Sequence, residues 1–188
     1  MKDKFQSLEA LVRQMIPSVV WSHKIQCKQA DIYKNRYNTL NVVNIIVSSL
    51  TTAGIFSILF ADEYWIKIIA AVFSFIVTSI SAFLKTFDLT TLEKEHMNTA
   101  NNLWDIRERL VILLIETGVG EKDYNDLMNT YETIQQDLKN IYSNAPTTMD
   151  RAVALAKKAL KNDGDYTYTD EEIDSFLPLI CRKTTPEV

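Results

Sequence analysis

Two long stretches of this sequence carry no charged residue, and they constrain the fold more than any other feature. The first runs from Tyr37 to Ala61, 25 residues, and the second from Ile68 to Leu84, 17 residues. A helix needs roughly 20 apolar residues to cross the ~30 Å hydrocarbon core of a bilayer. Leu40–Phe60 supplies 21 residues, 13 of them hydrophobic, and Trp65–Leu84 supplies 20, 15 of them hydrophobic. Each run is therefore long enough to span a membrane.

The alternative to a membrane hairpin is a buried pair of core helices in a soluble bundle. Core helices are rarely apolar over such a length, and a chain of 188 residues is too short to surround two of them with polar helices. Only residues 61–64 separate the two runs, which suits a tight turn between antiparallel helices. The sequence therefore predicts a two-span transmembrane helical hairpin.

The distribution of charge predicts the orientation of this hairpin. Residues 61–64 contain no Lys or Arg, whereas Lys28, Lys34 and Arg36 precede the first run and Lys85 follows the second. The positive-inside rule then places both termini of this multi-pass membrane protein in the cytoplasm. Residues 1–39 hold 7 basic and 3 acidic side chains, and this excess would favour an anionic inner leaflet. The simpler interpretation is that these charges set the topology or pair with the acidic C-terminal helices.

The remainder of the chain is predicted to be helical. With 4 Gly, 4 Pro and 2 Cys, the sequence excludes collagen-like, disulfide-framework and low-complexity classes and argues against a strand-rich fold. A short amphipathic helix is expected over Phe5–Ile16 and should end at Pro17. A second helix is expected to begin near Ser18 and to continue into the first span.

Two heptad seams follow the second span. Their apolar positions alternate three and four apart, and Gly118-Val119-Gly120 separates them. This pattern predicts an antiparallel helical hairpin whose seams pack against each other or against another subunit. The first seam is Leu89, Leu92, His96, Thr99, Leu103, Ile106, Leu110 and Leu113, and the second is Tyr124, Leu127, Tyr131, Ile134, Leu138 and Ile141.

His96 is a polar interruption of the first seam. It could titrate near neutral pH as a sensor, but a simple hydrogen bond within the seam is the more ordinary explanation.

The C-terminal region is predicted to form two short helices. Thr147–Leu160 should be basic, and a capping box from Thr169 to Glu172 should open the last helix, which would stop at Pro178. In the first of these helices the expected inward residues are Val153, Ala156 and Leu160, and the expected outward residues are Arg151, Lys157, Lys158 and Lys161.

These predictions define an all-α protein in four segments. Residues 1–39 form N-terminal cytosolic helices, 40–85 the transmembrane hairpin, 86–145 the cytosolic helical hairpin, and 146–188 the short C-terminal helices and a tail. The hairpin is expected to be continuous with the long cytosolic helices.

Polar residues inside the two spans are the candidate functional residues. Amide and hydroxyl groups are costly in hydrocarbon unless they are paired or hydrated, so each helix has one face that avoids lipid. Such faces pack helices together or, in an oligomer, line a water-filled path. The first face is Asn41, Asn44, Ser48 and Thr52, and the second is Ser74, Thr78, Ser81 and Lys85.

The sequence shows no enzymatic constellation. It contains no phosphate loop, no dinucleotide fingerprint and no paired-cysteine metal spacing, so neither an enzyme nor a cofactor is expected.

Residues 161–172 resemble a calcium loop, but Lys161 and Tyr166 occupy positions that call for a carboxylate and a glycine. A turn before a capped helix explains the same residues. Cys27 and Cys181 are expected to be free thiols. Nearby lysines could lower the pKa of Cys27, but no oriented base partner is visible in the sequence, so Cys27 is interpreted as a structural residue.

The order of these elements resembles the prokaryotic SLATT family, the SMODS- and SLOG-associating two-transmembrane effector domains. The resemblance covers roughly residues 18–181, and its motifs are diffuse helical patterns. The local matches are Trp21-Ser-His-Lys24, Tyr33-Lys-Asn-Arg36-Tyr, Leu84–Leu103 with Glu93-Lys94-Glu95-His96, Arg151…Ala156-Lys-Lys158 and Glu171-Glu-Ile173…Leu177-Pro178.

The resemblance implies a membrane effector of a bacterial antiviral system, encoded beside a nucleotide-second-messenger synthase or sensor. Such effectors are thought to assemble and disrupt the inner membrane, which arrests growth of the infected cell. Because two spans enclose no pore, this function requires a homo-oligomer. The alternative is a non-conducting membrane scaffold or signalling adaptor. No interaction with nucleic acid is expected.

Overall fold

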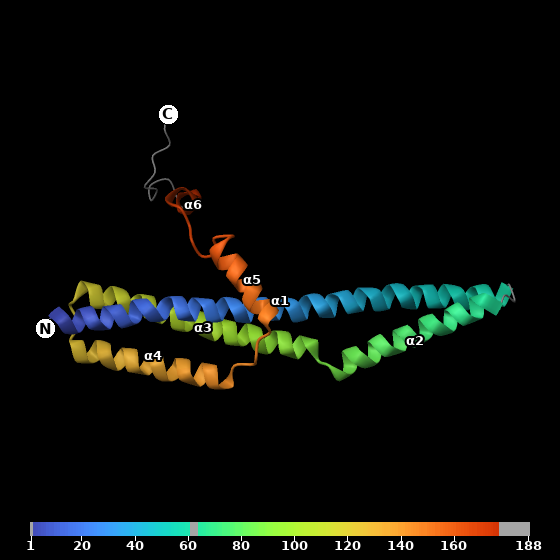
Figure 1. Ribbon diagram of the computed structural model, residues 1–188, viewed down its shortest axis with the longest axis horizontal. Coiled ribbons are helices and arrows are strands. Elements are labelled where there is room, and N and C mark those ends of the chain that lie inside the picture. Colours follow the sequence, from blue (N-terminus) through green and yellow to red (C-terminus); the bar gives the residue numbers. More distant parts are fainter. Residues whose placement is uncertain (1, 61–63, 177–188) are drawn as a thin grey trace, which may run out of the picture.

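The computed structural model describes residues 2–60 and 64–176, and every regular element within them is a helix. The all-α prediction is therefore confirmed. The described residues form a long rod with two parts (Figure 1). At one end two helices run side by side, and at the other end three helices pack together.

Helix α1 (Lys2–Phe60) extends along the whole rod, and its 59 residues are about 90 Å long at 1.5 Å per residue. The prediction that Pro17 ends a first helix is wrong, because α1 passes through this residue without a break. Proline removes one backbone hydrogen bond, to the carbonyl four residues earlier. Pro17 and Arg13 are both exposed, so water can reach that carbonyl. Buried Val12 and Val19 hold the helix against the core on both sides of the proline.

Helices α2 (Tyr64–Thr86) and α3 (Leu89–Val119) are separated by a break at Phe87 and Asp88. The Asp88 carboxylate accepts a hydrogen bond from the Thr91 backbone N–H at 2.9 Å and so caps α3. Its pKa lies below the ordinary value, chiefly because the Thr91 side chain also donates to it. The break marks the point where α2 ends and α3 begins its course beside α1, and α4 does not extend as far along the rod as this break (Figure 1).

The three-helix bundle contains the hydrophobic core. Gly120, with φ of 72°, ends α3 in the left-handed conformation that favours glycine, and α4 (Tyr124–Asn144) returns antiparallel to α3. The predicted helical hairpin is thus present, but α3 packs more extensively along the first half of α1 than against α4. The core residues are Leu8, Val12 and Val19 of α1, Leu103, Ile106, Leu110 and Leu113 of α3, and Leu127, Tyr131 and Ile134 of α4.

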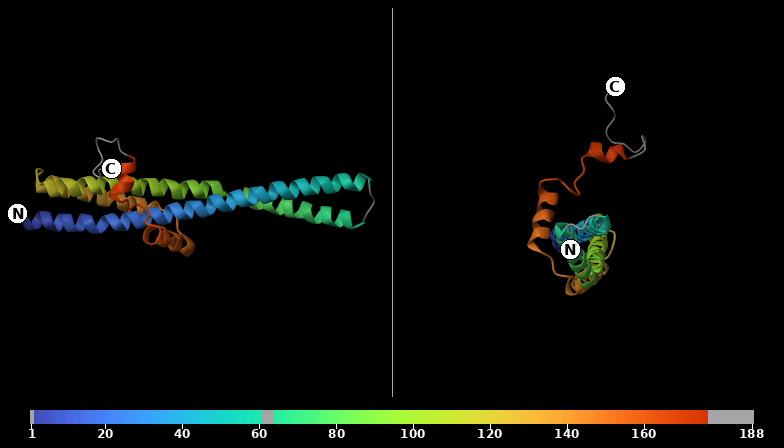
Figure 2. Two further views of the ribbon diagram at one scale, coloured as in Figure 1. Left: turned by 90° about the horizontal axis from the view of Figure 1, so that it is seen from above. Right: turned by 90° about the vertical axis from the view of Figure 1, so that its right-hand side faces the viewer.

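Helices α5 (Asp150–Lys161) and α6 (Asp170–Ser175) complete the described chain. Viewed along the rod, α5 lies beside the bundle and α6 extends away from it (Figure 2). The expectation that Val153 faces inward is wrong, because it is exposed, whereas Ala156 is buried and Leu160 half-buried, as expected. Ala152 and Ala159 are buried as well, and these small side chains let α5 approach α1 closely. The capping box of Thr169 and Glu172 is confirmed.

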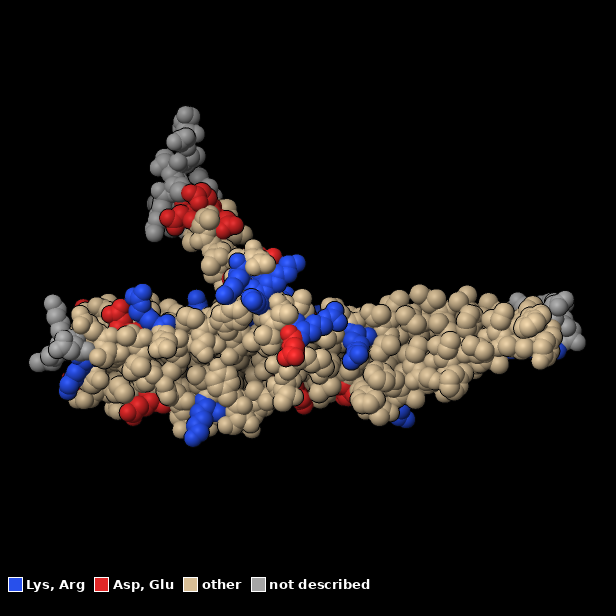
Figure 3. Space-filling view, viewed as in Figure 1, with Lys and Arg blue, Asp and Glu red and all other residues tan. Residues whose placement is uncertain are grey.

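Charged side chains are concentrated on the bundle and on α5 and α6, whereas most of the two-helix end shows none (Figure 3). Among the described residues two helices are long and apolar enough to cross a membrane. Many of their large apolar side chains are exposed, among them Ile45, Ile46, Phe56, Ile69 and Phe75. This is the surface expected of a hairpin surrounded by lipid rather than by protein.

Candidate functional site: the membrane hairpin and the polar junction

The two polar faces of the spans occupy different surroundings. Asn41, Asn44 and Ser48 are half-buried on the side of α1 that meets α2, and Thr52 is exposed. The Asn44 Nδ2 atom donates a hydrogen bond to the Ser81 Oγ atom at 3.4 Å. This contact joins the two faces at one point. The buried Asn44 Oδ1 atom has no hydrogen-bond partner among the described residues.

The polar face of α2 flanks the side of this helix that packs on α1. Ser74, Thr78, Ser81 and Lys85 are all exposed and lie roughly a quarter turn around α2 from its half-buried or buried residues, given 3.6 residues per turn. The Thr78 hydroxyl donates to the Ser74 carbonyl oxygen at 2.9 Å, so its proton is satisfied within its own helix. Apart from the contact between Asn44 and Ser81, the structure therefore does not bring the two predicted polar faces together as one surface.

Close helix packing within the hairpin depends on small residues. A Cβ atom placed on Gly54 would lie 3.6 Å from the Ala70 Cβ atom, which is ordinary van der Waals contact. Ala70 is the buried residue of α2. Small residues at a crossing allow two membrane helices to approach and to gain dispersion energy. Sequence analysis did not single out this pair, although Gly54 was the one glycine within the spans.

The seam residues of α3 and α4 line the core of the bundle. Most are buried, while Leu92, Tyr124, Leu138 and Ile141 are partly buried at its margins. His96 is buried, and its Nδ1 atom lies 2.5 Å from the Gln26 Oε1 atom of α1. Because an amide oxygen only accepts, Nδ1 carries the proton. Burial lowers the pKa of His96, despite the opposing charge of Glu95. The Tyr33 ring stacks on the imidazole with centroids 5.5 Å apart.

A row of polar residues on α1 joins this helix to the end of α4 and to the segment before α5. The Gln26 Nε2 atom donates to the Pro146 carbonyl at 3.4 Å, and the Gln29 Oε1 atom accepts from the Met149 backbone N–H at 2.9 Å. Tyr142 donates to the Ser22 hydroxyl at 2.9 Å. We call this row, with His23 and Lys24, the polar junction. The hydrophobic patterns used to predict helices did not reveal it.

An aromatic cluster attaches the segment between α5 and α6 to the polar junction. The rings of His23, Trp104 and Tyr166 lie 5.1 to 5.7 Å apart, centroid to centroid. Lys24 forms an ion pair with Asp165 and lies 4.7 Å from the centre of the Tyr166 ring. The hydrogen bond from Lys24 holds the pKa of Asp165 below its ordinary value. Burial lowers the pKa of His23 and raises that of Tyr166.

Cys27 lies beside this cluster, with its Sγ atom 3.4 Å from the His23 Nε2 atom. Burial raises the pKa of the Cys27 thiol, and the nearby lysines do not overcome this effect. The lowering of the pKa that the lysines could have caused is therefore not found, which agrees with the interpretation of Cys27 as a structural residue. Cys27 is a free cysteine, and Cys181, Pro178 and the predicted tail lie outside the described residues.

The residues that resemble a calcium loop serve other purposes. Asp165 pairs with Lys24, and Glu172 caps α6 through the Thr169 backbone N–H at 2.8 Å. Tyr166 adopts a positive φ of 68° at the position that would need glycine. No group of three or more metal-binding side chains occurs in the part of the chain that the structure describes. Arg151, Lys157, Lys158 and Lys161 are exposed on α5, as expected.

Comparison with known proteins places this arrangement in a family. No curated protein and no solved structure matches the chain. A family model does match residues 8–172, which include all of α2 to α5 and most of α1. The chain belongs to the SMODS and SLOG-associating 2TM effector domain family 4.

Proposed function

We propose that this protein is a membrane effector of a bacterial antiviral defence system, and that copies of it assemble to open a polar path through the inner membrane. The family supports the membrane effector role. The resulting loss of the membrane barrier would arrest growth or kill the infected cell. The catalytic chemistry of an enzyme has no part in this mechanism.

The observation that carries the proposal is the exposed polar face of α2. Ser74, Thr78 and Ser81 lie at helical spacing on the outside of a hairpin whose other outward residues are mostly apolar. Lys85 continues the same face toward the bundle. Polar groups inside a membrane are placed where they meet water or one another. In a ring of hairpins, these faces would line the central opening.

Assembly follows because one hairpin encloses no opening. The bundle offers an apolar surface for contact with a second copy, since Ile112, Ile115 and Val119 are exposed on one side of α3. Their spacing of three and four residues forms a continuous strip along the helix. The seam residues of α3 and α4 already pack against other helices of the same chain, so contact between copies would use this outer strip rather than the seams.

The proposed orientation places both termini and the bundle in the cytoplasm. Residues 61–64 carry no Lys or Arg, whereas the opposite end of the spans is rich in both. A cytoplasmic bundle could then receive a signal from a co-encoded nucleotide-second-messenger synthase or sensor. The polar junction connects all parts of the bundle, so it is the place where such a signal would alter the packing.

Dye leakage from anionic liposomes tests the polar path. We expect Ser74→Leu with Thr78→Leu to reduce leakage at least tenfold at equal incorporation. Ser79→Leu is the matched control, because Ser79 is an exposed residue of the same helix that lies outside the polar face. Equal leakage from all three proteins would contradict a polar path and indicate general bilayer damage. If liposomes carrying the wild-type protein do not leak dye, the same three proteins can be compared by the growth arrest that each causes when it is expressed in cells.

A non-conducting scaffold is the second candidate, and one observation favours it. The hydroxyls of Thr52 and Thr78 donate to their own helices at 3.0 and 2.9 Å, so they can face lipid without an unpaired proton. A scaffold would show neither leakage nor growth arrest, and the leucine substitutions in the polar face would leave partner recruitment unchanged.

A further inference from the structure

A groove lies between α1 and the start of α5, outside the polar face of the hairpin. It has a volume of about 570 Å³, and its lining runs along α1 from Lys28 to Leu40. Arg151 at the first turn of α5 closes it from the other side. Residues of the polar junction do not line it, so it is a separate feature of the molecule.

The groove is cationic. Lys28, Arg36 and Arg151 line it together with one acidic residue, Asp31, which gives three positive charges against one negative charge. Lys28 lies 3.7 Å from the Asp31 carboxylate. Among the described residues Arg36 and Arg151 form no ion pair with Asp or Glu. Two guanidinium groups are therefore left to bind an anion, and guanidinium binds phosphate through paired hydrogen bonds.

The groove is also apolar at its surface. Ile32, Leu40, Met149 and Leu155 line it beside the cations, and Met149 and Leu155 are exposed. Free phosphate or another small anion would bind the cations of the groove without contacting these apolar side chains. A molecule with a charged group and a hydrocarbon chain would contact both parts of the lining.

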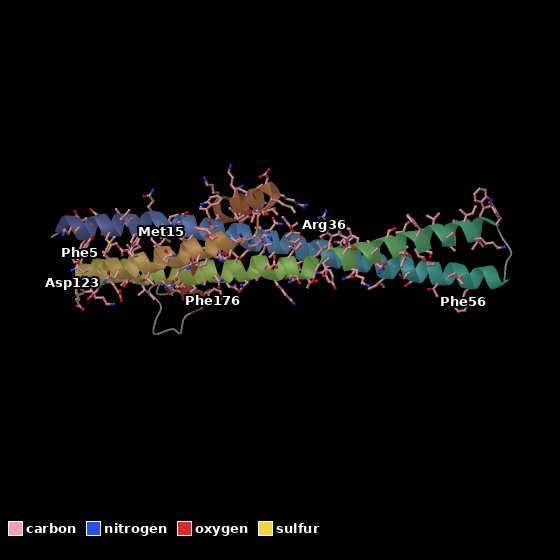
Figure 4. The ribbon with its side chains drawn as sticks, turned by 90° about the horizontal axis from the view of Figure 1, so that it is seen from below. Phe5, Met15, Arg36, Phe56, Asp123 and Phe176 are labelled. Atoms are coloured by element: carbon pink, nitrogen blue, oxygen red, sulfur yellow. The ribbon has the colours of Figure 1, made fainter. Side chains whose placement is uncertain are left out.

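The groove opens where the membrane is expected to begin. Leu40 is the first residue of the predicted first span, and Arg36 lies four residues earlier, about 6 Å along the helix axis. The headgroup layer on each side of a bilayer is about 5–8 Å thick. Figure 4 shows Arg36 on α1 between α5 and the hairpin. In Figure 3 basic side chains gather on α5 and beside the start of the uncharged end.

We propose that this groove binds the headgroup phosphate of an anionic phospholipid from the cytoplasmic leaflet. Arg36 and Arg151 would bind the phosphate, and an acyl chain would pass Leu40 and follow the hairpin. Bound lipid would fasten the start of α5 to α1 at the membrane surface. This assignment depends on the hairpin crossing the membrane but not on conduction, so its failure and the failure of the polar path are separate results.

The test measures the melting temperature of the purified full chain in a neutral detergent. Dioleoyl phosphatidylglycerol, dioleoyl phosphatidylcholine and sodium phosphate are added separately. We expect phosphatidylglycerol to raise the melting temperature by about 5 °C more than phosphatidylcholine when it is in large excess over its dissociation constant. Arg36→Gln with Arg151→Gln should abolish this difference. Both residues are exposed, so the substitutions should not prevent folding.

Lys157→Gln with Lys158→Gln is the matched control, because it removes the same charge from exposed positions of α5 that do not line the groove. It should keep the full lipid effect. Native mass spectrometry of the same samples should show bound phosphatidylglycerol on the wild type and control only. Equal effects of the two lipids, an equal effect of sodium phosphate, or equal loss in both double variants would each overturn the proposal.

Discussion

The Nδ1 atom of His96 on α3 donates to the Oε1 atom of Gln26 on α1, across 2.5 Å of buried interface. The same Gln26 side chain donates to the Pro146 carbonyl, so one residue of α1 joins α3 to the segment between α4 and α5. His23, which also has a lowered pKa, lies one helical turn earlier on α1. Two buried, neutral histidines therefore stabilise the contact between α1 and the rest of the bundle.

These histidines should make stability depend on pH. Burial lowers the pKa of both in the folded state, whereas in the unfolded chain each titrates near 6.5. Below about pH 6.5 the unfolded chain binds more protons than the folded one, so stability is full above this pH and declines as the pH falls. We expect the melting temperature to drop between pH 7.5 and 5.5, and the drop to be smaller in His23→Gln with His96→Gln.

The two single variants should each remove part of this dependence. His23 lies next to Lys24, whose charge adds to burial in lowering the His23 pKa, and Glu95 acts in the opposite direction on His96. If the melting temperature of the double variant falls as steeply as that of the wild type, the loss of stability between pH 7.5 and 5.5 is caused by carboxylates and not by these histidines.

The core of the bundle should tolerate truncation poorly. Leu110 is fully buried among residues of the three helices, and Leu110→Ala removes apolar contacts and leaves a cavity. Such substitutions cost about 2–5 kcal/mol. For a domain of this size that lowers the melting temperature by roughly 5–15 °C. Ile112→Ala on the exposed side of α3 is the control, and it should change the melting temperature of the detergent-solubilised monomer by less than about 2 °C.

Much of this architecture could be predicted from the sequence, because helical periodicity and apolar length are local properties. The two spans, the hairpin of α3 and α4 and the Thr169 capping box all follow from such signals. The role of α1 as the third helix of the bundle could not be predicted in this way, because the seams of α3 and α4 could equally have packed against a second subunit. Pro17 was misjudged for a related reason: contacts from Val12 and Val19 hold α1 straight through it.

The polar junction was beyond sequence reasoning for a different physical reason. Gln26 and Gln29 bond to the backbone carbonyl of Pro146 and the backbone N–H of Met149, groups that every stretch of chain possesses. The residue types in a sequence therefore do not indicate which backbone group a glutamine side chain will bond to. Likewise, the four polar residues of α2 were identified by their spacing, but only the structure shows that all four are exposed and that Ser81 alone contacts the polar face of α1.

Hairpin packing should depend on the size of residue 54. The Cβ atom of alanine would sit 3.6 Å from Ala70, which is ordinary contact, so Gly54→Ala should leave the hairpin intact. Gly54→Leu would push α2 away and disturb the hydrogen bond between Asn44 and Ser81. We expect this larger substitution to lower the melting temperature in detergent by several degrees and to increase hydrogen exchange in 40–56. Equal behaviour of the two variants would contradict close packing at Gly54.

Tyr166 should fasten the segment after α5 to the bundle. Its ring contacts His23 and Trp104, its hydroxyl lies 3.3 Å from the His23 Nδ1 atom, and Lys24 lies over its face. Aromatic pairs contribute about 0.5–1.5 kcal/mol each beyond the area they bury. In Tyr166→Ala we therefore expect faster proteolysis and hydrogen exchange over residues 162–176, with little change in the exchange of the α3 core.

The neighbouring tyrosine provides the control for this prediction. Tyr168 is 67% exposed and takes no part in the aromatic cluster, so Tyr168→Ala should leave the exchange of residues 162–176 at the wild-type rate. Tyr166→Phe separates the ring from the hydroxyl. Because the ring contacts outnumber the single contact to His23, this variant should keep most of the protection. Protection that is lost in Tyr166→Phe and Tyr168→Ala alike would mean that the segment is held by something other than the cluster.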